Sequence, residues 1–218
     1  MSPELSLIIG NKCYSSWSLR PWLLLKYFEV DFGEISVALD TPEFYARITE
    51  LSPNRRVPAL HDGSLVIWDS LAICEYVNET RLNGRGWPVK RELRAIARSV
   101  CAEMHSGFQS LREQLPMNLR REAREPGLLN EQCVKDIERI RTLWRELLGR
   151  HGGPFLFGTF SIADCFYAPV AARFRDYAIS LGSVERGYIE SIYALPAMQQ
   201  WLQAARAEPN RLAKYESV

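Results

Sequence analysis

Two short segments near residue 60 combine groups that could bind a peptide. In the first, Val57 and Pro58 precede a short apolar stretch, and a proline at such a point can hold a cis peptide bond. A cis bond would turn the backbone N–H and C=O of Val57 outward, where they could pair with an extended peptide in antiparallel fashion. The segment therefore predicts a docking edge for a short peptide.

The second segment carries groups suited to the two ends of such a ligand. Asp69 and Ser70 follow an apolar run and precede a stretch with helical periodicity, which places the Ser70 hydroxyl at a helix N-terminus. The free backbone N–H groups of that terminus favour a carboxylate, and the Asp69 carboxylate suits an ammonium group. A ligand with one ammonium, one carboxylate and a central pair of main-chain hydrogen bonds is a short peptide of γ-glutamyl character.

The elements that must position these segments alternate between strands and helices over the first eighty residues. Strands are expected at 5–9 and around 35–39, helices at 16–28 and 70–80, and a further helix after the second strand. A hairpin with its turn at Asp62-Gly63 comes between them. The order β-α-β-α-β-β-α predicts a mixed four-stranded sheet with helices packed on it, as in thioredoxin-like folds.

The rest of the chain has helical periodicity throughout. A cluster of glycine and proline ends the alternating pattern, so we expect a thioredoxin-like domain at 1–82, a linker at 83–89 and an all-helical domain at 90–218. Apolar residues in this second domain recur with a period of 3.6. They predict one long helix through 93–115 and another through 134–148.

Composition and charge exclude several classes of protein. The 218 residues are 47% hydrophobic and 24% charged, with a formal net charge of +1, which gives no electrostatic reason to expect nucleic acid as a partner. The purely apolar runs are too short for a membrane segment. Residues 1–4 lack the basic and apolar features of a signal peptide, so a cytoplasmic location is expected.

Cysteine and histidine usage bears on the cellular compartment and on metal binding. The five cysteines are scattered and odd in number, which suits a reducing compartment better than a disulfide framework. The three histidines lie far apart and show no spacing typical of metal ligands. We therefore expect no metal site.

The two peptide-binding segments also carry a family resemblance. The run Ser52 to Leu60, followed by Asp69 to Ile73, resembles the glutathione-binding half of the glutathione transferase superfamily. The runs 154–158 and 161–164 resemble the helix-capping segment of that family's C-terminal domain. The similarity covers nearly the whole chain and is to cytosolic, serine-type, zeta-like bacterial members.

The resemblance implies an enzyme with a thioredoxin-like N-terminal domain and an all-α C-terminal domain. Glutathione would be the co-substrate. Its thiol would attack a small electrophile, as in detoxification, or would serve a glutathione-dependent isomerisation, as in zeta-like relatives. The resemblance further implies a homodimer.

By the same resemblance, individual residues acquire roles in holding glutathione. Arg56 takes the place of a lysine or glutamine that contacts the glycyl carboxylate, and Val57, next to Pro58, supplies the backbone pair. Asp69 replaces a more usual glutamate or glutamine near the γ-glutamyl amine. Ser70 belongs to the anion site beside it.

In this superfamily a donor near the start of the first helix stabilises the glutathione thiolate. The candidates here are Ser15 and, next to it, Ser16. Lowering a thiol pKa from ~8.5 by about two units requires roughly 2.7 kcal/mol. A hydroxyl donating to an anion supplies about 1.5–3 kcal/mol, and a helix N-terminus about 0.3–1 kcal/mol. One well-placed serine is therefore enough.

Other interpretations of this segment stay open. Residues 13–16 also resemble the CxxS form of glutaredoxin-like proteins, in which Cys13 would form mixed disulfides and the protein would be a glutathione-dependent thiol-disulfide reductase. Cys13 is equally explained as a small buried hydrophobe, and the serines as helix caps. A non-catalytic interaction module of this architecture is a further alternative.

The electrophile pocket is expected between the two domains, along the first long helix of the second. Met104, His105, Phe108 and Arg112 are the residues predicted to line it, with Met117 after them. Met and aromatic residues at this spacing are also typical of a core, and a histidine beside an apolar stripe is also typical of a structural one.

Overall fold

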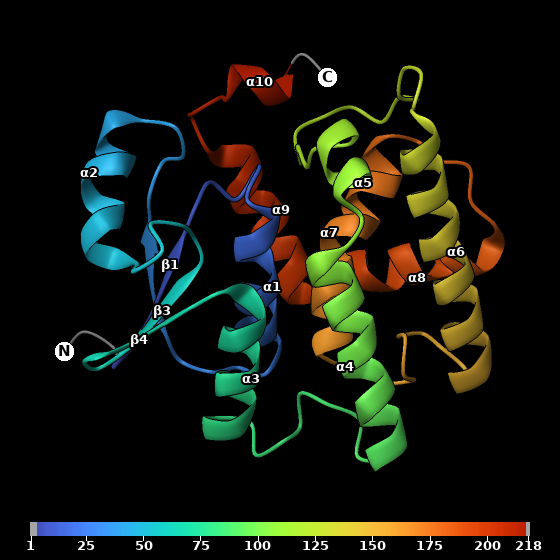
Figure 1. Ribbon diagram of the computed structural model, residues 1–218, viewed down its shortest axis with the longest axis horizontal. Helices are drawn as coiled ribbons and strands as arrows, with labels where there is room; N and C mark the ends of the chain where they lie inside the picture. The colour runs from blue at the N-terminus through green and yellow to red at the C-terminus, as the bar shows by residue number, and fades with distance from the viewer. Residues whose placement is uncertain (1–3, 217–218) are drawn as a thin grey trace.

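A four-stranded mixed sheet forms the centre of the N-terminal part of the chain in a computed structural model, which describes residues 4–216 (Figure 1). Its strands have the spatial order β2-β1-β3-β4. They are β1 (Leu5–Ile9), β2 (Gly33–Ser36), β3 (Ala59–Asp62) and β4 (Leu65–Trp68). Only β1 and β2 run parallel, while β3 is antiparallel to both of its neighbours.

Helices cover both faces of the sheet. They are α1 (Ser16–Tyr27), α2 (Pro42–Leu51) and α3 (Ser70–Thr80). Successive side chains of a strand point to opposite faces. Leu7 and Ile9 of β1 therefore join the main core with α1 and α3, whereas Ile8 packs with Phe44 and Ile48 of α2. This arrangement confirms the predicted thioredoxin-like fold.

The C-terminal part is all-helical, as the sequence predicts. Its elements are α4 (Arg91–Ser106), α5 (Gln109–Gln114), α6 (Glu131–His151), α7 (Ile162–Asp176), α8 (Ser183–Ala194), α9 (Pro196–Ala207) and α10 (Ala213–Glu216). Helix α7 is buried over all but its last two residues and packs against α1, α4 and α8. It lies centrally among the other helices and joins the two parts of the molecule (Figure 1).

The prediction of one continuous helix through 93–115 is wrong. Helix α4 ends at Ser106, and Phe108 adopts a left-handed conformation with φ of 55° before α5 begins. A Cβ on Gly107 would lie 2.7 Å from the Glu103 carbonyl oxygen, so the break requires glycine. Met104, Phe108 and Leu111 are buried on both sides of the break, which is why apolar periodicity alone does not reveal it.

A buried capping box begins α7, and it gives a prediction about stability. The Asp164 carboxylate accepts hydrogen bonds from the backbone N–H of Leu156 (3.0 Å) and of Ser161 (2.8 Å), and from the hydroxyls of Ser161 and Tyr188. Because Asp164→Ala leaves these buried donors without an acceptor, we expect the free energy of unfolding to fall by about 3 kcal/mol or more. The half-exposed cap of α2 provides the control, since Thr41→Ala should cost about 1 kcal/mol. Denaturant unfolding measures both, and equal losses would contradict the assignment.

Candidate active site

Two adjoining cavities lie where the sheet meets the helical part. The smaller has a volume of about 200 Å³ and is lined by both peptide-binding segments. The larger has a volume of about 620 Å³ and extends from the start of α1 to the C-terminal residues. Trp17, Arg56 and Val57 line both cavities, so the two form one continuous site.

The smaller cavity gathers every residue that the sequence assigns to glutathione. These residues are Arg56, Val57, Pro58, Asp69 and Ser70. The peptide bond between Val57 and Pro58 is cis. Segments from two different loops thus meet on one small cavity of a size suited to part of a tripeptide.

Asp69 and Ser70 present polar atoms to this cavity. One Asp69 carboxylate oxygen caps α3 by accepting from the backbone N–H of Leu71 (2.8 Å) and of Ala72 (3.2 Å). The other oxygen lies 3.0 Å from His105 Nε2. The Ser70 hydroxyl is buried and has no hydrogen-bond partner within residues 4–216. Because buried hydroxyls are normally paired, this one fits a ligand carboxylate at the start of α3.

The structure does not place the predicted electrophile residues together. Met104 and Phe108 line neither cavity, because the apolar stripe to which they belong packs into the main core. His105 lines the smaller cavity instead of the larger one, facing Asp69. Arg112 alone of the four lines the larger cavity, together with Met117.

The two candidate serines both line the larger cavity, but their hydroxyls have different partners. Ser15 is the N-cap of α1, and its Oγ lies 2.7 Å from Ser18 Oγ. Ser18 Oγ accepts from the backbone N–H of Gly10 (3.2 Å). Either hydroxyl of this pair can be the donor; when Ser18 donates to Ser15, the Ser15 proton is free to point at a ligand.

Ser16 follows at the first position of α1 and is paired with a cation. Its Oγ accepts from Arg173 Nη2 at 3.3 Å. Arg173 is buried in α7 and also donates to the carbonyl oxygens of Leu115 (2.8 Å) and Pro169 (3.1 Å). Burial, with the nearby charge of Arg112, lowers the pKa of Arg173 to about 10, so the guanidinium stays charged at neutral pH.

Cys13 lies outside both cavities. Its side chain is fully buried, and its thiol donates to Asn118 Oδ1 at 3.2 Å. Burial raises the pKa of the Cys13 thiol above its ordinary value. A buried thiol with a raised pKa is a poor nucleophile, so the geometry does not favour the reductase alternative.

The larger cavity is strongly cationic. Among the described residues that line it, five carry positive charge and only Asp40 is acidic. The cations are Arg55, Arg56, Arg112, Arg173 and Lys214. Such a lining favours an anionic second ligand.

Trp17 lines both cavities at their junction. The Arg20 guanidinium lies 4.0 Å from the centre of the Trp17 ring and 4.6 Å from that of Phe166. Arg112 lies 5.5 Å from the same indole. These cations hold the indole by cation–π contacts, so Trp17 is a fixed wall at the point where the cavities meet.

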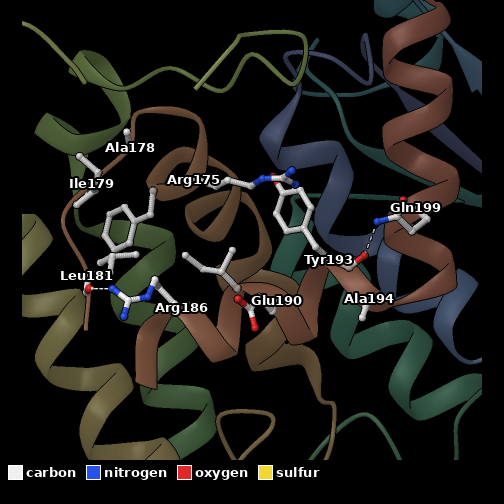
Figure 2. A pocket seen from close by; sticks show the side chains of 11 residues that line it. Arg175, Ala178, Ile179, Leu181, Arg186, Glu190, Tyr193, Ala194 and Gln199 are labelled. Carbon is white, nitrogen blue, oxygen red and sulfur yellow. Dashed lines mark hydrogen bonds between the residues drawn. The ribbon is translucent and has the colours of Figure 1, made fainter. Parts of the chain in front are cut away.

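Another large cavity lies elsewhere, between α7, α8 and the start of α9 (Figure 2). Its volume is about 650 Å³, and its lining includes Arg175, Arg186, Glu190 and Tyr193. No serine, cysteine or histidine is among the described residues that line it. It contains none of the residues that the sequence assigns to a site.

Residues 4–216 show neither the features of a metal site nor those of a membrane span. No group of three or more His, Cys, Asp or Glu side chains in that range suits a metal ion. None of the helices in the described part of the chain is long and apolar enough to span a bilayer.

Comparison with known proteins defines the class. Residues 14–80 match the family model of the glutathione S-transferase N-terminal domain, and residues 119–204 match that of the C-terminal domain. A maleylacetoacetate isomerase of Rattus norvegicus is 36% identical over 183 residues, which are 82% of this chain and 81% of the relative. The chain therefore belongs to the glutathione transferase superfamily.

Further relatives narrow the type. A zeta-class glutathione S-transferase of Euphorbia esula is 27% identical over 168 residues, 77% of this chain and 74% of the relative. A solved glutathione transferase homologue from Burkholderia, with bound glutathione, is 25% identical, covers 94% of this chain and 99% of its own, and superposes with a TM-score of 0.72. These findings confirm the predicted zeta-like type, with glutathione as co-substrate of a transferring or isomerising enzyme.

Proposed function

We propose that the protein is a glutathione-dependent isomerase of a small unsaturated dicarboxylic acid. The observation that carries this proposal is the cation-lined cavity that adjoins the glutathione-type cavity at Trp17, Arg56 and Val57. Relatives named as maleylacetoacetate isomerases, from Rattus norvegicus and from Caenorhabditis elegans at 32% identity, support the same class of substrate.

The reaction needs only a thiolate and a fixed geometry. The thiolate sulfur adds to one carbon of the cis double bond, which forms a C–S bond and moves the electron pair onto the conjugated carbonyl oxygen as an enolate. Rotation about the resulting single bond follows. Collapse of the enolate then restores the double bond in the trans form and expels the thiolate, so glutathione is not consumed.

The residues of the smaller cavity would hold glutathione. The Val57 backbone pairs with the central part of the tripeptide, while Asp69 accepts from its γ-glutamyl ammonium. Ser70 and the start of α3 take the adjacent carboxylate. Arg56, at the junction of the cavities, takes the glycyl carboxylate.

Ser15 would donate a hydrogen bond to the thiolate, and Arg112 and Arg173 would take the carboxylates of the acid. When Ser18 is the donor of the hydroxyl pair, the Ser15 proton is available. Ser16, whose Oγ accepts from Arg173, also keeps a proton and is the second candidate. The same two arginines would stabilise the enolate charge that develops in the transition state.

We further propose a homodimer in the cytoplasm. Leu65 and Trp68 on the edge strand β4 and Ile96 on α4 are large apolar side chains that remain exposed. Exposed apolar side chains of this kind favour a protein interface. The five cysteines are all free and buried, which is in keeping with a reducing compartment.

The proposal is tested by incubating the protein with a maleyl-type keto acid and glutathione while proton NMR follows the alkene signals. The expected result is conversion of the cis to the trans acid that requires glutathione and leaves its concentration unchanged. No conversion of the acid, with conjugation of a neutral aryl halide instead, would overturn the isomerase proposal.

Asp69→Asn provides a prediction for the glutathione cavity. The asparagine keeps an oxygen for the α3 cap but loses the charge that faces the ammonium group. A charge-assisted hydrogen bond contributes about 1.5–3 kcal/mol, so the KM for glutathione should rise roughly 10- to 100-fold with little change in kcat.

Asp62→Asn is the matched control for this variant. Asp62 ends β3 in the same domain, where its carboxylate bonds to Tyr76 and Arg81, and it lines neither cavity. The KM of the Asp62→Asn variant for glutathione should stay at the wild-type value. Steady-state kinetics measure the KM for glutathione of both variants. An unchanged KM in Asp69→Asn would show that the Asp69 carboxylate does not contact glutathione.

A further inference from the structure

Four arginines that line the two joined cavities have no carboxylate partner. Asp40, the acidic residue of the larger cavity, pairs with Lys214 at 2.5 Å, and Asp69 of the smaller cavity faces His105 at 3.0 Å. Within residues 4–216 no ion pair involves the other cations of the lining, which are Arg55, Arg56, Arg112 and Arg173. The charge of these four is therefore left for bound ligands to offset.

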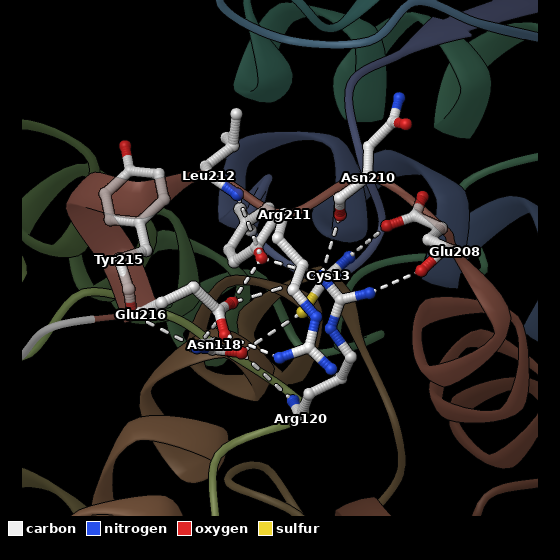
Figure 3. Close-up of polar contacts among 10 residues, drawn as sticks. Cys13, Asn118, Arg120, Glu208, Asn210, Arg211, Leu212, Tyr215 and Glu216 are labelled. Atoms are coloured by element: carbon white, nitrogen blue, oxygen red, sulfur yellow. Dashed lines mark hydrogen bonds and ion pairs between the residues drawn. The ribbon is translucent and has the colours of Figure 1, made fainter.

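The neighbouring cation Arg120 does not belong to this set, because other groups of the protein already use its charge (Figure 3). Its guanidinium donates to the carbonyl oxygens of Glu208 (2.5 Å) and Asn210 (2.8 Å) and to the Tyr14 hydroxyl (2.6 Å). It also lies 4.0 Å from a Glu216 carboxylate oxygen. Arg120 lines neither cavity, so the excess positive charge of the described lining comes from the four arginines.

The charges of the proposed ligands fit this set. The thiolate and the glycyl carboxylate of glutathione bring two negative charges, whereas its γ-glutamyl end is met by Asp69 and the start of α3. A dicarboxylic acid brings two more, so the two ligands together offset the four guanidinium groups. A monocarboxylic acid would leave one guanidinium without an anion. Charge complementarity therefore favours a second ligand that is a dianion.

Arg55 differs from the other three arginines in its place. It lines the larger cavity but not the smaller one, so it borders the space of the second ligand rather than that of glutathione. It belongs to the loop between α2 and β3, whereas Arg112 belongs to α5 and Arg173 to α7. Cations from both parts of the molecule thus border the space assigned to the acid.

The backbone at Arg55 has a conformation that arginine disfavours. Its φ is 57°, in the left-handed region where glycine is the favoured residue. Three hydrogen bonds fix this turn. The Arg55 N–H donates to the Ser52 carbonyl oxygen (2.9 Å), and Asn54 Oδ1 accepts from the Ser52 hydroxyl (2.8 Å) and from the Arg56 N–H (3.0 Å). Strained backbone of this kind clusters at ligand sites, which fits a binding role for the Arg55 side chain.

We propose that Arg55 is a specificity-determining residue, whose guanidinium contacts the carboxylate that lies farther from α7 and thereby selects dicarboxylic over monocarboxylic acids. This contact from the N-terminal part of the molecule adds to those of Arg112 and Arg173 from the helical part. The reaction that the acid undergoes rests on the proposed function, whereas the preference of the cavity for a dianion does not.

Calorimetry with an unreactive ligand tests this preference without using activity. Adipate, a saturated dicarboxylate, and its monomethyl ester are titrated into the glutathione-loaded protein. In Arg55→Gly the Kd for adipate should rise roughly tenfold, the lower end for a hydrogen bond between charged groups, because Arg55 is exposed to solvent. The Kd for the monomethyl ester should stay within about twofold of wild type. Arg55→Lys keeps the charge and should retain most of the affinity for adipate.

Unfolding measurements separate this role from a structural one. Because glycine is favoured at a left-handed position, Arg55→Gly should unfold at or above the wild-type temperature. A weaker affinity for adipate in that variant then does not come from damage to the fold. Arg47→Ala is the control, since Arg47 is exposed on α2 and lines neither cavity, and its Kd for adipate should stay at the wild-type value.

Three results would overturn the specificity role. They are wild-type protein that binds adipate no more tightly than the monomethyl ester, equal losses for both ligands in Arg55→Gly, and a loss in Arg55→Gly confined to glutathione. The last result would place Arg55 on the glycyl carboxylate. A preference for adipate that depends on Arg55, in a protein that does not isomerise a maleyl-type acid, would support this inference and remove only the proposed function.

Discussion

Replacing Ser15 by alanine is expected to raise the pKa of the bound glutathione thiol by about two units. The Ser15 hydroxyl accepts from the backbone N–H of Ser18 (3.4 Å) and can turn its own proton to the thiolate, so the alanine variant removes the donor itself. At a pH of about 6.5, the thiolate fraction would drop from about one half to about one hundredth, which lowers kcat/KM roughly 50-fold.

Ser16→Ala is the matched control for this prediction. Ser16 lines the same cavity, and its Oγ accepts from Arg173, which leaves its own proton free as well. If Ser15 alone is the donor, loss of the Ser16 hydroxyl changes the thiol pKa by less than about half a unit. Thermal unfolding checks that both variants fold, since loss of the Ser15 cap costs only about 1 kcal/mol. The reverse ranking of the two variants would move the donor role to Ser16.

Replacing Arg173 by methionine is expected to have the second large effect. The variant removes a buried charge that faces the larger cavity, and a hydrogen bond to a charged group contributes about 1.5–3 kcal/mol, so kcat/KM for the dicarboxylic acid should fall roughly 10- to 100-fold. Because the pKa of Arg173 is about 10, the wild-type guanidinium loses its charge, and with it affinity for the acid, as the pH rises through that value.

A comparison of two substrates separates charge recognition from damage to the fold. Arg173→Met should impair turnover of the acid far more than turnover of its neutral ester, because only the acid carries the charge that Arg173 faces. The exposed Arg139→Met, remote from both cavities, should change neither. Equal losses for acid and ester in Arg173→Met would show that the side chain is structural only, through its bonds to Leu115 and Pro169.

The features that could be predicted from the sequence are local ones. Val57-Pro58 and Asp69-Ser70 each occupy two consecutive positions, and the order of strands and helices around them determines where they meet. Ser15 lies just before an apolar stretch with helical period, which is enough to place it at a helix start. For such segments, short-range propensities and the topology of a small sheet suffice.

The features that could not be predicted depend on contacts between distant parts of the chain. Arg173 is hydrogen-bonded to Ser16, which lies 157 positions away in the sequence, and Tyr14 to Glu216, which lies 202 positions away. Periodicity distinguishes buried from exposed positions, but it does not tell which buried residues line a cavity. For this reason the sequence predicts a pocket lining that includes Met104 and Phe108, and these two residues lie in the core.

A titration of glutathione bound to the wild-type protein tests the central claim most directly. Ultraviolet absorbance of the thiolate, recorded against pH with free glutathione as reference, gives the ionisation midpoint of the bound thiol. The midpoint is expected about two units below that of free glutathione. A bound thiol that ionises at the same pH as free glutathione would contradict it.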